Sequence, residues 1–175
     1  MIAASAMLGG CALAPEAERE TESRSPVLGE LAAALPGRYA TVAGSEPDER
    51  LSLEVGLAPG RSEDRLRLVM AQSDADDDNA PRRFMLGLTP ADESNRLDGE
   101  FAPMTSDGNH ERSCAMVFRY NERGLAGETD PQQCRFGESG NETGLLKEIA
   151  FDGRRLVIGD RLIDLASGQP AAPDR

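Results

Sequence analysis

The chain has 175 residues, of which 39% are hydrophobic and 4% aromatic, and its formal net charge is -12. This length allows one domain of about 150 residues behind a polar front segment. No apolar run is long enough to form a membrane-spanning helix. The acidic balance argues against a nucleic-acid partner, because a phosphate backbone requires a basic protein surface.

The first eleven residues predict a targeting segment. Residues 1–10 are apolar and rich in small side chains, and Cys11 follows them. Leu8-Gly9-Gly10-Cys11 resembles a bacterial lipobox, in which the cysteine sulfur carries the lipid. The alternative is a secretory signal with an incidental cysteine. Because Ala12 replaces the aspartate that retains lipoproteins at the inner membrane, we expect a lipid anchor in the outer membrane, with the protein facing the periplasm.

Residues 12–24 predict a disordered acidic tether, because the run Glu16–Glu22 is highly charged and has no apolar face. The domain is expected over residues 25–169, with residues 170–175 as a disordered tail. It opens with a helix, since Ser25 suits the N-cap, Pro26 suits the first helical position and Pro36-Gly37 ends the pattern.

Short strands are expected from Arg38 onward. Apolar and polar residues alternate over residues 51–57, 66–70, 84–88 and 116–120, and less clearly over 97–101. Asp152-Gly153 is the strongest two-residue hairpin turn in the chain. About ten such strands with one N-terminal helix predict a mainly β fold, either an antiparallel barrel or a sandwich.

A cysteine stands at each end of a predicted hairpin, at Cys114 and Cys134. If Cys11 carries lipid, these two remain as a pair in an oxidising compartment, and we predict a disulfide between them. The alternative is a metal or thiol-redox site. The chain contains no CxxC motif, and His110 is its single histidine, so zinc ligands are too few.

No metal site is predicted in the acidic insert either. Asp74, Asp76 and Asp78 have the spacing of the first ligands of a calcium loop. Asn79 stands where that loop needs glycine, and Met85 where it needs glutamate, so we expect an acidic surface loop. No nucleophile motif or phosphate-binding glycine loop marks a catalytic centre.

Several segments are similar to the CpcT/CpeT chromophore lyase family. The run Leu31–Tyr39 resembles its opening helix and G-x-Y strand, and the segment Cys114–Cys134 resembles its paired-cysteine hairpin. Leu146–Ile149 and Gly159–Arg161 continue in register with its last strands. The likeness covers roughly residues 28–169. It implies a calycin-like, lipocalin-shaped barrel that binds an open-chain tetrapyrrole (a bilin) and attaches it to a cysteine of a phycobiliprotein.

The family also shows an acidic-Gln pair and a Tyr-Arg pair on neighbouring strands. The matching places here hold Ala71-Gln72 and Pro81-Arg82-Arg83, so the acid and the tyrosine are absent. Whether the chain is an enzyme is therefore left open. We expect a monomer or weak dimer that works as a binding module for a small apolar or tetrapyrrole-like ligand. The alternatives are a bilin lyase and a structural envelope barrel without a ligand.

Four residues are the candidates to bind that ligand: Tyr39, Arg82, Arg83 and Lys147. An arginine pair suits the bidentate recognition of propionates. Lys147 shares an alternating face with Leu145 and Ile149, so it is expected to point inward. The alternatives are that it emerges at the barrel mouth or that the other face of the strand is the buried one. An inward lysine requires a partner or a ligand anion.

Overall fold

The computed structural model describes residues 26–41, 51–59, 62, 64–74, 80–105, 108–109, 112–137 and 142–171. The expected signal segment with Cys11, the acidic tether, His110 and most of the acidic insert lie outside the described residues. No helix in the described ranges is long and apolar enough to cross a membrane.

One helix precedes the sheet, as predicted. It is α1 (Pro26–Ala34), and it buries Leu28, Leu31 and Ala32. Leu35 follows the helix and is 1% exposed, and its amide still donates to the Leu31 carbonyl at 2.9 Å. Spacings of three and four residues place these side chains on one face, which packs against the apolar side of the sheet.

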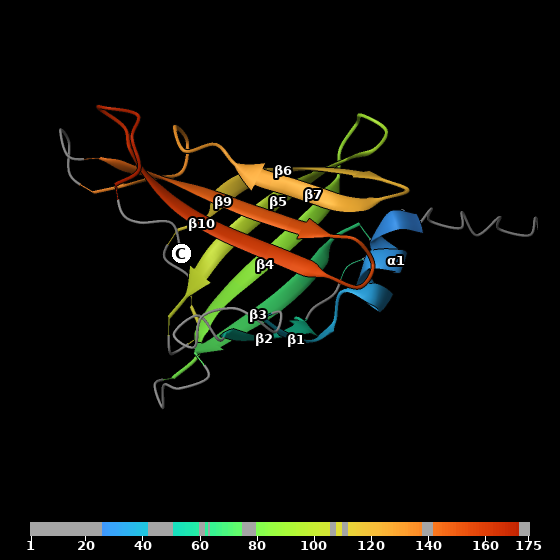
Figure 1. Cartoon of the computed structure of the whole chain (residues 1–175). Helices are drawn as coiled ribbons and strands as arrows, with labels where there is room; N and C mark the ends of the chain where they lie inside the picture. Colours follow the sequence, from blue (N-terminus) through green and yellow to red (C-terminus); the bar gives the residue numbers. More distant parts are fainter. Residues whose placement is uncertain are drawn as a thin grey trace, which may run out of the picture.

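Ten strands follow: β1 (Gly37–Ala40), β2 (Leu51–Leu57), β3 (Leu66–Asp74), β4 (Arg82–Pro90), β5 (Arg96–Met104), β6 (Cys114–Asn121), β7 (Gly124–Thr129), β8 (Arg135–Phe136), β9 (Thr143–Phe151) and β10 (Leu156–Asp164). They form one antiparallel sheet in the order β1-β2-β3-β4-β5-β6-β7-β9-β10, with β8 paired to β9 (Figure 1).

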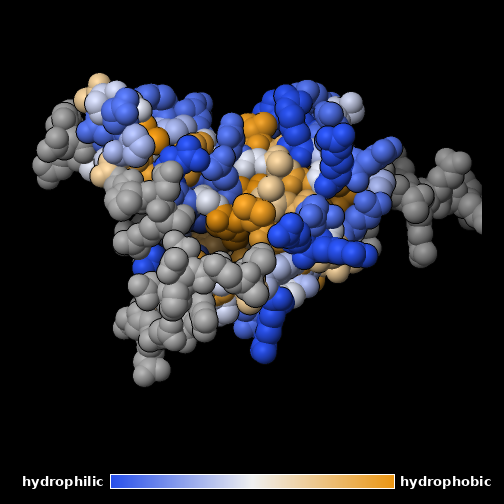
Figure 2. Space-filling model, viewed as in Figure 1, coloured by the Kyte–Doolittle hydropathy of each residue, from blue (hydrophilic) through white to orange (hydrophobic). Residues whose placement is uncertain are grey.

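The sheet curls until its distant strands meet across the interior. The ammonium group of Lys147 on β9 lies 4.8 Å from the ring centre of Phe84 on β4, although three strands separate β4 from β9 in the sheet. The curl sets the apolar side chains of both halves against each other. Figure 2 shows apolar surface in the middle of the same view, with hydrophilic side chains on either side. The predicted mainly β, antiparallel architecture with one helix is therefore confirmed.

The sheet is not closed into a barrel, because no pairing in the described part of the chain joins β1 to β10. One reason is that β1 has only four residues, fewer than half of the nine in β10. Another is that the chain end occupies part of the free edge of β10, since the Ala171 amide donates to the Leu162 carbonyl at 2.7 Å. Ala171 thus pairs with the sheet, although the tail was expected to begin at residue 170. The gap between the edges of β1 and β10 is called the seam below.

Phe118 of β6 fills the middle of the interior and is 0% exposed. Two glycines on the neighbouring strands make room for its ring. A Cβ atom at Gly99 of β5 would lie 2.5 Å from the ring, and one at Gly127 of β7 would lie 2.3 Å from it. Real Cβ atoms do not approach so closely, so both positions require glycine as long as Phe118 stays in place.

The predicted disulfide joins Cys114 at the start of β6 to Cys134 before β8, and the two Cα atoms lie 5.1 Å apart. Both cysteines are buried. The hairpin β6–β7 turns at its far end through Gly124, whose φ of +126° is a backbone conformation that favours glycine. The bridge therefore lies at the end of the hairpin opposite to its turn.

Candidate functional site

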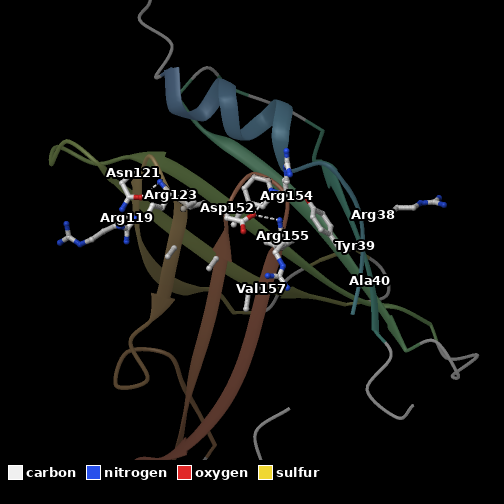
Figure 3. A pocket seen from close by; sticks show the side chains of 16 residues that line it. Arg38, Tyr39, Ala40, Arg119, Asn121, Arg123, Asp152, Arg154, Arg155 and Val157 are labelled. Carbon is white, nitrogen blue, oxygen red and sulfur yellow. Dashed lines mark hydrogen bonds between the residues drawn. The ribbon is translucent and has the colours of Figure 1, made fainter. Parts of the chain in front are cut away.

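An open trough of about 750 Å³, whose lining side chains are drawn in Figure 3, lies at the end of the sheet next to α1. It extends over the C-terminal ends of β6 and β9 and the N-terminal ends of β7 and β10, and it crosses the seam to β1. Its lining residues define what we call the arginine trough: Arg38, Tyr39, Ala40, Arg119, Asn121, Arg123, Gly124, Leu125, Ala126, Ala150, Phe151, Asp152, Arg154, Arg155, Leu156 and Val157.

Strand register explains the floor of the trough. Arg119, Ala126, Ala150 and Val157 face one another in a single row across four strands. Their chain neighbours, such as Phe118, point into the core, so this row lies on the outer face of the sheet. Two alanines in the middle of the row leave a shallow hollow between the larger side chains at its ends. Val157 is 61% exposed there and adds apolar surface.

The rim of the trough is strongly cationic. Five of its sixteen lining residues are arginines, and one, Asp152, is acidic. The arginines come from three separate parts of the chain: β1, the β6–β7 hairpin and the turn between β9 and β10. On a chain with a net charge of -12, this makes the trough a local region of opposite sign.

Asp152, the single acidic residue of the trough, stabilises the turn that carries two of the arginines. The Asp152 carboxylate accepts the backbone amides of Arg154 at 3.0 Å and Arg155 at 2.7 Å, and Gly153 supplies a φ of +93°. These amide donors hold the pKa of Asp152 below its usual value. The sequence Asp-Gly-Arg-Arg therefore builds the predicted turn between β9 and β10, but four residues, not two, stand between the paired Phe151 and Leu156. Two of these four carry consecutive guanidinium groups.

Two of the five arginines already have carboxylate partners. Arg119 pairs with Glu93 at 2.9 Å, and Arg38 lies 3.9 Å from Glu54. Figure 3 shows these two side chains extending away on opposite sides, whereas Arg154, Arg155 and Tyr39 lie together in the middle of the view. Within the described ranges, no ion pair engages the guanidinium groups of Arg123, Arg154 or Arg155. These three are the groups available to an anionic ligand.

Tyr39 forms the wall of the trough on the β1 side, so one of the four predicted site residues lies here. Its hydroxyl donates to the Leu35 carbonyl at 2.7 Å, just beyond the end of α1. Burial raises the pKa of this phenol above its ordinary value. The tyrosine therefore holds α1 against β1 and presents the half-buried ring to the seam.

Arg82 and Arg83 lie elsewhere. They are exposed at the start of β4, opposite Gln72 and Ala71, whereas the other end of β4 lies on the side of the trough. Seven residues of extended strand separate the two ends, a distance of roughly 23 Å. The structure therefore does not bring this arginine pair together with Tyr39.

Lys147 is the only lysine of the chain, and its side chain points into the interior, where it is 2% exposed. Its ammonium group lies 2.6 Å from the Asp160 carboxylate on β10 and over the rings of Phe84 and Phe101, at 4.8 and 5.0 Å. Burial lowers the pKa of this amine, and Asp160 opposes part of that effect. Lys147 thus has its partner within the chain and does not line the trough.

None of the five arginines of the trough was predicted from the sequence as a site residue; they are Arg38, Arg119, Arg123, Arg154 and Arg155. Only the Asp152-Gly153 turn offered a signal, because a tight turn displays the residues that follow it. The row on the outer face depends on strand register across four strands, which one sequence does not reveal.

The arrangement suits an anion with an apolar body. Guanidinium groups bind carboxylates and phosphates in a bidentate manner, and the alanine floor accepts a flat apolar surface. In comparisons with known proteins, no family model matches the chain, and no curated protein is significantly similar to it. The function is therefore inferred from the residues of the trough.

Proposed function

We propose that the protein is a binding module that holds a small ligand with an apolar body and anionic groups in the arginine trough. The observation that carries the proposal is the pair Arg154 and Arg155, displayed by one tight turn beside a floor of small residues. A tetrapyrrole with two propionates is one member of this ligand class, which agrees with the expectation from the family resemblance.

The energetics favour moderate affinity. The arginines are exposed, so water and salt weaken each contact with a carboxylate. The apolar part adds roughly 25 cal/mol for each Å² of surface that leaves water. Such a site is suited to a ligand that exchanges readily, with a Kd on the order of micromolar.

The proposed setting is the bacterial cell envelope, with the chain anchored by lipid at Cys11. Two observations support it: the lipobox-like Leu8-Gly9-Gly10-Cys11 and the disulfide between Cys114 and Cys134, a bond typical of oxidising compartments. We assign the curled sheet to the calycin-like barrels. Its interior is packed with side chains such as Phe118, so the ligand is placed in the trough at the end of the sheet.

The test is an absorbance titration of the purified chain with biliverdin. The double variant Arg154→Gln/Arg155→Gln is expected to weaken binding at least tenfold, since it removes two charged hydrogen-bond donors. The variant Arg82→Gln/Arg83→Gln removes the same charge at the other end of β4 and should leave the Kd unchanged. Biliverdin dimethyl ester, which lacks the carboxylates, should bind both variants and the wild type equally weakly. Equal losses in the two double variants would refute the site.

A further inference from the structure

An acidic segment of the chain itself is a candidate to occupy the trough. Residues 16–22 read Glu-Ala-Glu-Arg-Glu-Thr-Glu, with glutamates at every second position. In an extended chain, alternate side chains point to the same side, about 7 Å apart. Four carboxylates can then face one surface together.

The position of this segment brings it within reach of the trough. Residue 22 is four residues before the start of α1 at Pro26, and four extended residues span up to about 14 Å. The helix has nine residues and is therefore roughly 14 Å long. In Figure 3 its C-terminal end lies next to Arg154 and Tyr39, and the Tyr39 hydroxyl donates to the Leu35 carbonyl just beyond that end. A segment tethered to the first turn of α1 can therefore reach the arginines.

Charge explains why the segment would bind there rather than elsewhere. The chain has 31 acidic residues against 19 basic ones, so most of its surface repels a run of glutamates. The trough has the opposite balance, with five arginines and one aspartate. Arg123, Arg154 and Arg155 have guanidinium groups without an ion pair among the described residues.

We infer that Glu16–Glu22 binds in the arginine trough and competes with the anionic ligand. The inference rests on the proposed function and adds its regulation. Because the segment is covalently attached, its effective concentration is on the order of millimolar, so even weak pairing occupies the site. An anionic ligand must displace the segment from the arginines before it can bind.

Two quadruple variants test the competition. In the first, Glu16→Gln, Glu18→Gln, Glu20→Gln and Glu22→Gln remove the charges of the segment, and biliverdin should bind about tenfold more tightly, the gain expected when a tethered competitor is lost. In the second, Asp74→Asn, Asp76→Asn, Asp77→Asn and Asp78→Asn remove four charges from the last residue of β3 and the insert that follows it. This control should leave the Kd unchanged. An equal gain in both variants would overturn the inference, because net charge alone would explain it.

A second measurement does not depend on biliverdin. A fluorescently labelled peptide of residues 12–24 is added to the glutamine variant, and its anisotropy is followed. We expect saturable binding that is lost when Arg154→Gln/Arg155→Gln is added and retained when Arg82→Gln/Arg83→Gln is added instead. If biliverdin binds to no variant, the proposed function fails and the peptide alone decides the inference. A peptide that does not bind overturns the inference whatever biliverdin does.

Discussion

The ammonium group of Lys147 and the carboxylate of Asp160 lie 2.6 Å apart, but only one of them is hidden from water. The lysine side chain is 2% exposed and the aspartate side chain is 50% exposed. They face each other across β9 and β10, with the aspartate on the strand that borders the seam. Removing the aspartate should therefore lower the stability of the fold much more than removing the lysine.

Asp160→Ala should destabilise the fold by about 3 kcal/mol, the lower end of the range for a broken buried pair, because it leaves a buried ammonium group without its anion. Lys147→Met should cost less than about 1 kcal/mol, since methionine fills a similar volume between the Phe84 and Phe101 rings and Asp160 stays partly hydrated. Urea denaturation measures both. Equal losses for the two variants would contradict the asymmetry.

Lys147 also predicts a pH dependence. Its pKa in the folded protein is lowered from 10.5 by burial, so between that lowered pKa and 10.5 the unfolded chain binds more protons than the folded one. Stability contributed by this group is therefore lowest at neutral pH and rises as the pH approaches 10.5. The free energy of unfolding of the wild type, minus that of Lys147→Met, should increase from pH 7 to pH 10.5. A difference that is constant or falls over this range would show that burial does not perturb the amine.

The inward position of Lys147 shows what the alternation of residues along a strand can predict from the sequence and what it cannot. The pattern Leu145, Lys147, Ile149 assigns the three residues to one face, and the structure confirms that this face is the interior. The partner on β10 could not be named, because it depends on a register set by the whole hairpin. The missing closure of the barrel has the same origin, since neither the shortness of β1 nor the return of Ala171 onto β10 follows from local periodicity.

The disulfide gives a prediction about reduction. Cys114 and Cys134 are separated by 20 residues along the chain, and a bridge over such a loop stabilises the folded state by about 3 kcal/mol in the chain-entropy model. A reductant should lower the free energy of unfolding of the wild type by that amount. The variant Cys114→Ala/Cys134→Ala should start at the lower value and not respond to reductant. Both proteins are compared in a Cys11→Ser background, where two free thiols in the oxidised protein that keeps Cys114 and Cys134 would exclude the bridge.

Gly127→Ala is expected to destabilise the fold through overpacking. The added methyl group would lie 2.3 Å from the Phe118 ring, which is fully buried and cannot move away. Forcing an extra carbon into such a core costs about 1–3 kcal/mol. Gly56→Ala on β2 is the matched control, because nothing lies within 4 Å of the added carbon there, and its stability should be unchanged or slightly higher.

A smaller side chain at position 118 tests whether the collision with the Phe118 ring is the cause of the loss, or whether β7 does not tolerate alanine at position 127 for another reason. Phe118→Leu shortens the ring side chain that collides with it, at the cost of its own cavity. If the collision is the cause, Gly127→Ala should destabilise the Phe118→Leu background by at least 0.5 kcal/mol less than the wild type, a coupling of the size expected for residues in contact. Thermal denaturation of the four proteins measures this coupling. Strictly additive losses would mean that Gly127 is required by its backbone, and that Phe118 does not depend on it.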